Sequence, residues 1–145
     1  MILISHRGNL SGRLESRENK IDYIEEAIAL GFDVEIDVWF VEGSFFLGHD
    51  TAETHIDFSW FEKRKENLWI HAKNAQALEE LMSTDLHYFF HENDLATITS
   101  KGFIWVYPGN QPIRNSIAVL PELFDDRVFQ CSGVCSDFIL NYKKT

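Results

Sequence analysis

The fold is decided by one stretch of the sequence, FDVEIDVW at residues 32–39. Apolar and acidic residues alternate along it, which predicts a β-strand with its three aliphatic residues on one face and Glu35 and Asp37 on the other. The Glu-Gly pair at residues 42–43 then predicts a turn into a second strand over residues 44–48. The stretch therefore predicts a hairpin whose first strand carries two carboxylates.

Short apolar segments recur along the rest of the chain and alternate with helix signals. Strands are expected over residues 2–5, 68–72, 87–90, 102–107, 117–120 and 134–137, with a further candidate at 127–131. Helices are expected over residues 58–66, 74–82 and 93–99, and after Asn19, which can cap a helix that Gly31 ends. This alternation predicts βα units around a parallel sheet, as in α/β folds.

The length of the chain limits this architecture. Its 145 residues suit one domain over residues 1–145, whereas a complete TIM barrel takes about 200 residues or more. We therefore expect an α/β fold of the shortened or incomplete TIM-barrel type, with outer helices reduced or missing. The outer face would stay apolar where helices are missing, which makes the chain a candidate for homo-oligomer formation.

Charge and hydropathy narrow the classes of partner. The formal net charge is −10, which disfavours nucleic-acid binding because that depends on Lys and Arg neutralising phosphates. An acidic chain that binds a phosphodiester needs a local cation, so the negative net charge is compatible with a bound metal ion. The alternative is that the negative charge serves only to keep the protein soluble. No apolar run approaches the roughly 20 residues of a membrane span, and the first residues lack the features of a signal peptide. We expect a soluble, cytoplasmic protein.

Chemically active side chains gather at the ends of the expected strands. They are His6 and Arg7 after the first strand, Glu35 and Asp37 in the quoted one, His49 after the hairpin, His71 and Lys73 at the next strand, and His91 and Asp94 after the one that follows. In a parallel barrel the carboxyl ends of the strands meet on one face, where active sites are built. Each cluster alone also has a structural interpretation, since a His at a strand end is often held only by hydrogen bonds.

Glu35 and Asp37 present the sharpest chemical choice. Carboxylates two residues apart on a strand point to the same side, and two unpaired anions are costly to bury together. A hard divalent cation with oxygen ligands removes that cost. The alternative is a solvated strand face, because Asp33 lies on the same side.

The clusters, taken in order over residues 4–50, resemble the glycerophosphodiester phosphodiesterase family of the phospholipase C-like phosphodiesterases. The family pattern begins with His-Arg-Gly, found here at residues 6–8, and continues with Glu-Asn, found at residues 18–19. Residues 31–38, GFDVEIDV, match its Gly-x-Asp-x-x-Glu-x-Asp-Val run in all but the lead-in. Gly43 and the His-Asp pair at residues 49–50 match its closing turn.

The resemblance implies a barrel of the family's type and a role for each matched residue. The acid/base pair would be His6 and His49, the phosphate ligand Arg7, the metal ligands Glu35 and Asp37, and the site-organising residues Glu18 and Asn19. The metal in this family is usually Mg²⁺ or Ca²⁺.

Beyond residue 50 the sequence departs from the family pattern. His71 stands where the family carries a Glu that serves as a third metal ligand, and this change favours a borderline metal such as Mn²⁺ or Zn²⁺. Lys73 keeps the position of a phosphate-binding Lys, and Asp137 resembles the Asp of the family's closing Thr-Asp. His91, Asp94 and Trp105 are candidates for the pocket wall, although Trp105 is equally typical of a core residue.

Together these features predict metal-dependent hydrolysis of a small-molecule phosphodiester, similar to a glycerophosphodiester, by His acid/base catalysis. The alternative is a non-catalytic protein that binds a phosphodiester or sugar phosphate on the same scaffold. Two acid/base groups favour the enzyme, because binding alone does not need them.

Overall fold

The computed structural model describes residues 1–144, which contain ten strands and three short α-helices. The strands are β1 (Ile2–His6), β2 (Asp33–Val41), β3 (Ser44–Leu47), β4 (Thr54–Ile56), β5 (Leu68–Ala72), β6 (Tyr88–Phe89), β7 (Ala96–Ile98), β8 (Ile104–Val106), β9 (Ser116–Val119) and β10 (Gly133–Ser136). The helices are α1 (Ile21–Ala29), α2 (Phe58–Arg64) and α3 (Ala75–Leu81), with two 3-10 turns, η1 (Pro121–Leu123) and η2 (Ile139–Tyr142).

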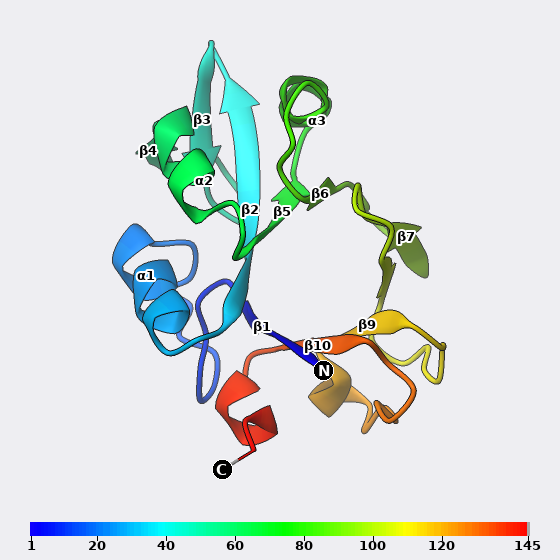
Figure 1. Ribbon diagram of the computed structural model, residues 1–145. Coiled ribbons are helices and arrows are strands. Elements are labelled where there is room, and N and C mark those ends of the chain that lie inside the picture. Colours follow the sequence, from blue (N-terminus) through cyan, green and yellow to red (C-terminus); the bar gives the residue numbers. More distant parts are fainter. Residues whose placement is uncertain (145) are drawn as a thin grey trace.

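All ten strands belong to one curved, mixed sheet with the order β4-β3-β2-β1-β10-β9-β8-β7, and β5 and β6 branch from β2. β2 has three partners because it is long. Its first part pairs in parallel with β1 and β5, and its last residues pair antiparallel with β3. Figure 1 shows α1, α2 and α3 near the strands from β1 to β6, while β7 and β9 have no α-helix beside them.

The expectation of a shortened TIM barrel is wrong. A TIM barrel has eight parallel strands, each followed by a helix, whereas the β2–β3, β3–β4 and β7–β8 pairs are antiparallel here. No strand ladder joins β6 to β7 within residues 1–144, so the molecule is a strand-rich half-barrel. Chain length gives the physical reason: residues 99–103 are all that connect β7 to β8, and a parallel crossover takes about a dozen residues.

Individual elements follow the sequence more closely than the architecture does. The hairpin at Gly43 and the strand over residues 68–72 are confirmed. The helix expected over residues 93–99 is wrong, because Ala96–Ile98 form β7 and pair with β8. In the candidate segment 127–131 there is no strand.

Asn19 does not cap α1 as expected. Lys20 occupies the N-cap position, and the Asn19 side chain bonds to Asp37 instead.

Apolar residues form two clusters on the two faces of the sheet. The larger one lies beneath the helices and includes Ile24, Phe61 and Leu81. The smaller one, here called the inner cluster, consists of Ile4, Trp69, Phe89, Trp105, Ile117, Val119 and Cys135. Both faces of the sheet are thus packed, which explains why β2 is buried on its acidic side as well as its aliphatic side.

Among the described residues, no helix is both long enough and apolar enough to pass through a bilayer. This agrees with the absence of an apolar run in the sequence.

Candidate functional site

The predicted residues meet because β1, β2 and β5 lie side by side and run in the same direction. The register places His6 opposite Glu35 and Asp37 opposite His71. A cavity of about 380 Å³ opens at these strand ends. Its charged and imidazole-bearing lining residues are His6, Arg7, Glu35, His49, His71, Lys73, His91 and Glu92.

The two β2 carboxylates are buried, so the interpretation as a solvated strand face is wrong. Glu35 is 2% exposed and Asp37 is fully buried. The two oxygens of Asp37 have different surroundings. Oδ2 lies 3.0 Å from Arg7 Nε and accepts a 2.9 Å hydrogen bond from Asn19, whereas Oδ1 faces His71.

His71 is held by a backbone group in one ring position. Its Nε2 lies 3.0 Å from the carbonyl oxygen of His91, which can only accept, so Nε2 carries the hydrogen. In the neutral ring Nδ1 is then a lone pair, and it lies 3.2 Å from Asp37 Oδ1. Two lone pairs at this distance repel, so either a second proton on the ring or a cation must lie between them.

The same place has the donor set of a metal site. Ligand atoms of Glu35, Asp37 and His71 all lie within 4.8 Å of one another. Glu35 Oε2 and Asp37 Oδ1 are buried and have no hydrogen-bond partner among the described residues. A ligating His commonly donates its other N–H to a carbonyl, as His71 does. These residues fit a divalent cation, and the mixed oxygen and nitrogen donors suit Mn²⁺ or Zn²⁺ as well as Mg²⁺.

Electrostatics separate the two carboxyl groups. Burial, followed by the adjacent charge of Asp37, raises the pKa of Glu35 well above its usual range. Burial also acts to raise the pKa of Asp37, but the rings of His49 and His71 and the charge of Arg7 hold it well below its usual range. A cation at this point would remove the penalty on the Glu35 anion.

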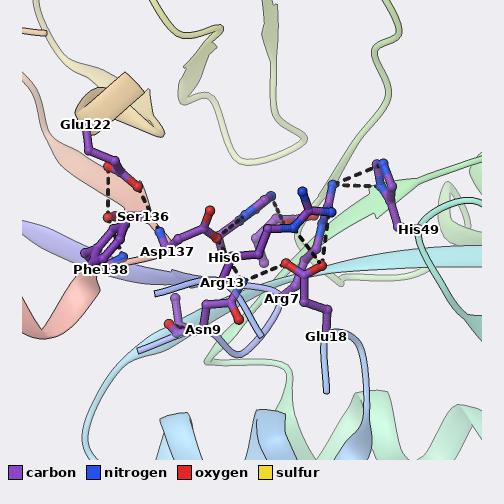
Figure 2. Close-up of polar contacts among 12 residues, drawn as sticks. His6, Arg7, Asn9, Arg13, Glu18, His49, Glu122, Ser136, Asp137 and Phe138 are labelled. Carbon is purple, nitrogen blue, oxygen red and sulfur yellow. Dashed lines mark hydrogen bonds and ion pairs between the residues drawn. The ribbon is translucent and has the colours of Figure 1, made fainter. Parts of the chain in front are cut away.

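His6 is oriented by a carboxylate from the other end of the chain. Its Nδ1 donates to Asp137 Oδ1 over 2.7 Å, which leaves Nε2 of the neutral ring as the free acid/base position. Nε2 lies 3.6 Å from Glu35 Oε2 at the cavity. Figure 2 shows Asp137 between His6 and the Glu122 and Ser136 pair. Burial opposes it, but the bond from His6 lowers the pKa of Asp137.

Arg7 and His49 bind each other as well as Asp37. Arg7 Nη2 donates to His49 Nδ1 over 2.7 Å, and Arg7 Nη1 lies 3.7 Å from Glu18 Oε1. Burial acts against it, but Asp37 and other carboxylates raise the pKa of Arg7. Since its Nε faces Asp37, Arg7 mainly holds Asp37 and His49 in this arrangement, and a phosphate would compete with His49 for Nη2.

Glu18 and Asn19, to which the resemblance assigns the organisation of the site, lie in the loop before α1. Both are buried. Asn19 bonds to the side chain and the backbone of Asp37, while Glu18 contacts Arg7 and Arg13. A second group, His6, Glu18 and Asp137, also brings ligand atoms together. There Asn9 donates to both carboxylates, so a hydrogen-bonded amide occupies the place of a cation.

The remaining predicted residues are divided between the cavity and its surroundings. Lys73 lines the cavity, and among residues 1–144 no carboxylate lies within ion-pair distance of it. His91 also lines the cavity and stacks on the His71 ring with centroids 4.7 Å apart. Trp105 is both core and cavity wall. Asp94 lies exposed outside the cavity lining.

Three contributors were missed or left without a role by the sequence. Asn9 ties Glu18 to Asp137, Glu122 holds the backbone of Asp137, and Asp137 orients His6. Asn9 directly follows the His-Arg-Gly motif, so its position in the sequence could have indicated a role in the site. No sequence signal indicates such a role for Glu122.

Comparisons with protein-family models, with curated proteins and with solved structures found no match. The chemistry proposed for the site therefore rests on the residues of the site itself.

Proposed function

We propose that this chain is a metal-dependent phosphodiesterase acting on a small-molecule phosphodiester of the glycerophosphodiester kind. One observation carries the proposal. Glu35 Oε2, Asp37 Oδ1 and His71 Nδ1 converge in a buried place, and the two carboxylate oxygens have no hydrogen-bond partner among residues 1–144. Buried carboxylate oxygens without a partner are costly, so the geometry favours a cation that would also attract a phosphate.

Glu35, Asp37 and His71 would hold the metal, which by resemblance is Mg²⁺ or Ca²⁺ and by its His ligand is also suited to Mn²⁺ or Zn²⁺. When bound, such an ion supplies Lewis-acid stabilisation of charge on the phosphate. Lys73 adds a free positive charge at the same cavity. Because its charge has no carboxylate partner among the described residues, Lys73 is better suited to bind the phosphate than Arg7.

His6 is the better prepared of the two acid/base groups. Its Nε2 faces the cavity, and Asp137 stabilises the imidazolium that forms when Nε2 takes a proton. Nε2 would take this proton from the attacking hydroxyl and then give it to the leaving alkoxide, so that His6 returns to its neutral form. His49 has to give up its bond from Arg7 before Nδ1 can accept a proton.

A second candidate is a binding protein without turnover. The observation that favours it is the engagement of Arg7 and His49 with each other, which leaves only His6 ready for proton transfer. On this reading the cavity would hold a phosphodiester or a sugar phosphate and release it unchanged.

We also propose the kind of partner and the cellular location of this protein. We expect a small-molecule ligand rather than nucleic acid, and a cytoplasmic location. Self-association would use the uncovered outer face near β7 and β8, where Leu95, Ile98 and Ile104 are exposed.

Hydrolysis of bis(p-nitrophenyl) phosphate and of glycerophosphodiesters by metal-stripped protein, resupplied in turn with Mg²⁺, Ca²⁺, Mn²⁺ and Zn²⁺, tests the proposal. We expect turnover that depends on the metal and is lost in Glu35→Gln and His6→Ala. His55→Ala is the matched control, because His55 is exposed on β4 outside the cavity. Tight binding of metal or phosphate without turnover would support the binding protein instead.

A further inference from the structure

We propose that the substrate is a dissolved phosphodiester in which one of the two alcohols is apolar, either alkyl or aryl. This inference rests on the proposed function and deepens it. It follows from the cavity-lining residues contributed by β8, β9 and η1 and by the segments that follow β8 and β9, here called the apolar wall. The apolar wall consists of Trp105, Tyr107, Pro108, Val119, Leu120 and Leu123.

The apolar wall has a different composition from the rest of the cavity. Its polar side-chain atoms are the indole nitrogen of Trp105 and the hydroxyl of Tyr107, while the other four side chains have none. A polyol bound here would lose hydrogen bonds to water and regain few of them, which is unfavourable. An alkyl or aryl group would instead remove apolar surface from water.

One residue of the apolar wall, Leu120, has an uncommon backbone conformation. Leu120 has φ 45° and ψ 53°, a left-handed conformation that is uncommon for a residue with a side chain. This strained conformation lies at a cavity-lining position, where such strain is often maintained for function. Leu123 lines the cavity although it is 61% exposed, and the adjacent Phe124 is 66% exposed. The apolar surface therefore continues outward from the cavity along η1.

The volume sets a limit on the apolar group. The cavity holds about 380 Å³, which is near the small end of ligand sites and has to contain the phosphate as well. A short alkyl chain or a single aromatic ring fits this space, and a longer chain would extend over Leu123.

The test uses glycerol 3-phosphate diesters of methanol, butanol and hexanol, with glycerophosphoglycerol as the fully polar member. We expect kcat/KM to rise about 10-fold or more from the methyl to the hexyl diester, because a few methylene groups are removed from water. Equal rates along the series, or a preference for glycerophosphoglycerol, would overturn the inference while leaving the phosphodiesterase itself intact.

Leu120→Asn is the decisive variant. Asn has a similar size and tolerates the left-handed conformation, so the backbone is retained while the wall becomes polar. We expect the ratio of kcat/KM for the hexyl diester to that for the methyl diester to fall from about 10 or more to about 1. Leu123→Ser, at an exposed position, gives the same comparison without risk to the fold.

Equilibrium binding of methylphosphonate and hexylphosphonate tests the apolar wall even if no diester is turned over. Tighter binding of hexylphosphonate to the wild type, reduced in Leu120→Asn, supports the apolar subsite in either case. Equal affinities would overturn it. Absence of turnover with tighter hexylphosphonate binding would contradict the phosphodiesterase but not the apolar subsite.

Discussion

The two walls of the cavity are built by different parts of the sheet and differ in almost every physical respect. The charged wall, which consists of His6, Arg7, Glu35, His71 and Lys73, stands at the ends of β1, β2 and β5, which are aligned in parallel. The apolar wall stands on β8, β9 and η1, which are short and lie where Figure 1 shows no covering α-helix at β9. In the proposed function, the charged wall would act on the phosphodiester and the apolar wall would determine which diester is bound.

The two walls also treat a buried histidine in opposite ways. His6 in the charged wall has Asp137 as its partner, at 2.7 Å. His87, beside the inner cluster, has its ring 4.0 Å from that of Trp69 in a tilted arrangement and bonds to the hydroxyl of Thr99 at 2.7 Å. A carboxylate stabilises a protonated ring and a hydroxyl does so far less. Of these two histidines, His6 therefore has the environment suited to proton transfer.

The largest expected effect is the loss of proton transfer at the charged wall. His6→Ala should lower kcat about 100-fold or more, since it removes the acid/base group. Asp137→Asn should lower kcat by less and also shift its pH profile, because Asp137 acts through His6. Steady-state rates across pH, with His55→Ala as the control, measure both effects. Equal rates in His6→Ala and the wild type would break the division between the walls.

Replacement of a metal ligand should change stability and affinity in opposite directions. Glu35→Gln removes a buried anion, so the metal-free protein should melt at a higher temperature, while divalent-metal affinity falls about 10-fold or more. Calorimetry with and without Mn²⁺ measures both quantities. A lower melting temperature of the metal-free variant would show that Glu35 is stabilised by its neighbours and needs no cation.

Removal of the free charge at the cavity should weaken binding rather than chemistry. Lys73→Met keeps the apolar stem of the side chain and should raise KM about 10-fold with a smaller change in kcat. Initial rates over a range of substrate concentrations separate the two constants. Lys63→Met, on the outer helix α2, is the matched control. A fall in kcat alone would indicate that Lys73 acts in the transition state and would contradict a role in binding the substrate in the ground state.

The smallest effect concerns pH and the apolar side. Burial lowers the pKa of His87 to about 4, below the ordinary value of 6.5. The unfolded chain therefore binds the proton first, and stability is lost as pH falls from about 6.5 to about 4. With an allowance for partial solvent screening, the loss amounts to roughly 1–2 kcal/mol.

The comparison that isolates this loss is between the wild type and His87→Gln. Urea unfolding at pH 7 and at pH 4.5 should show a larger fall for the wild type than for the variant. His91, whose pKa burial also lowers to about 4, adds to the fall in both proteins. Identical falls would mean that His87 is not held neutral by the inner cluster.

The charged wall could be predicted from local sequence patterns, whereas the apolar wall depends on the packing of segments that such patterns do not specify. The charged wall was largely predictable, because alternation along β2 and a parallel register place Glu35, Asp37 and His71 together. The apolar wall was not, apart from Trp105 as a candidate for the pocket. Its position depends on how β8, β9 and η1 pack, and apolar residues in short strands do not indicate which face they line.

The errors have local physical causes. Residues 93–99 began with good helix-capping residues, but the β-branched run at residues 97–99 favours a strand once β8 is available as a partner. Asn19 had the chemistry of a helix cap, yet bonding to buried Asp37 was the stronger demand. The prediction of a TIM barrel was wrong because the chain lacks the length for the crossovers of such a barrel.

Equilibrium binding of Mn²⁺, followed by the electron paramagnetic resonance of the free ion, tests the proposed metal site. We expect one Mn²⁺ per chain in the wild type, the same affinity in His55→Ala, and binding about 10-fold or more weaker in both Glu35→Gln and His71→Ala. Absence of Mn²⁺ binding to the wild type, or equal affinity in all four proteins, would contradict a metal site at Glu35, Asp37 and His71.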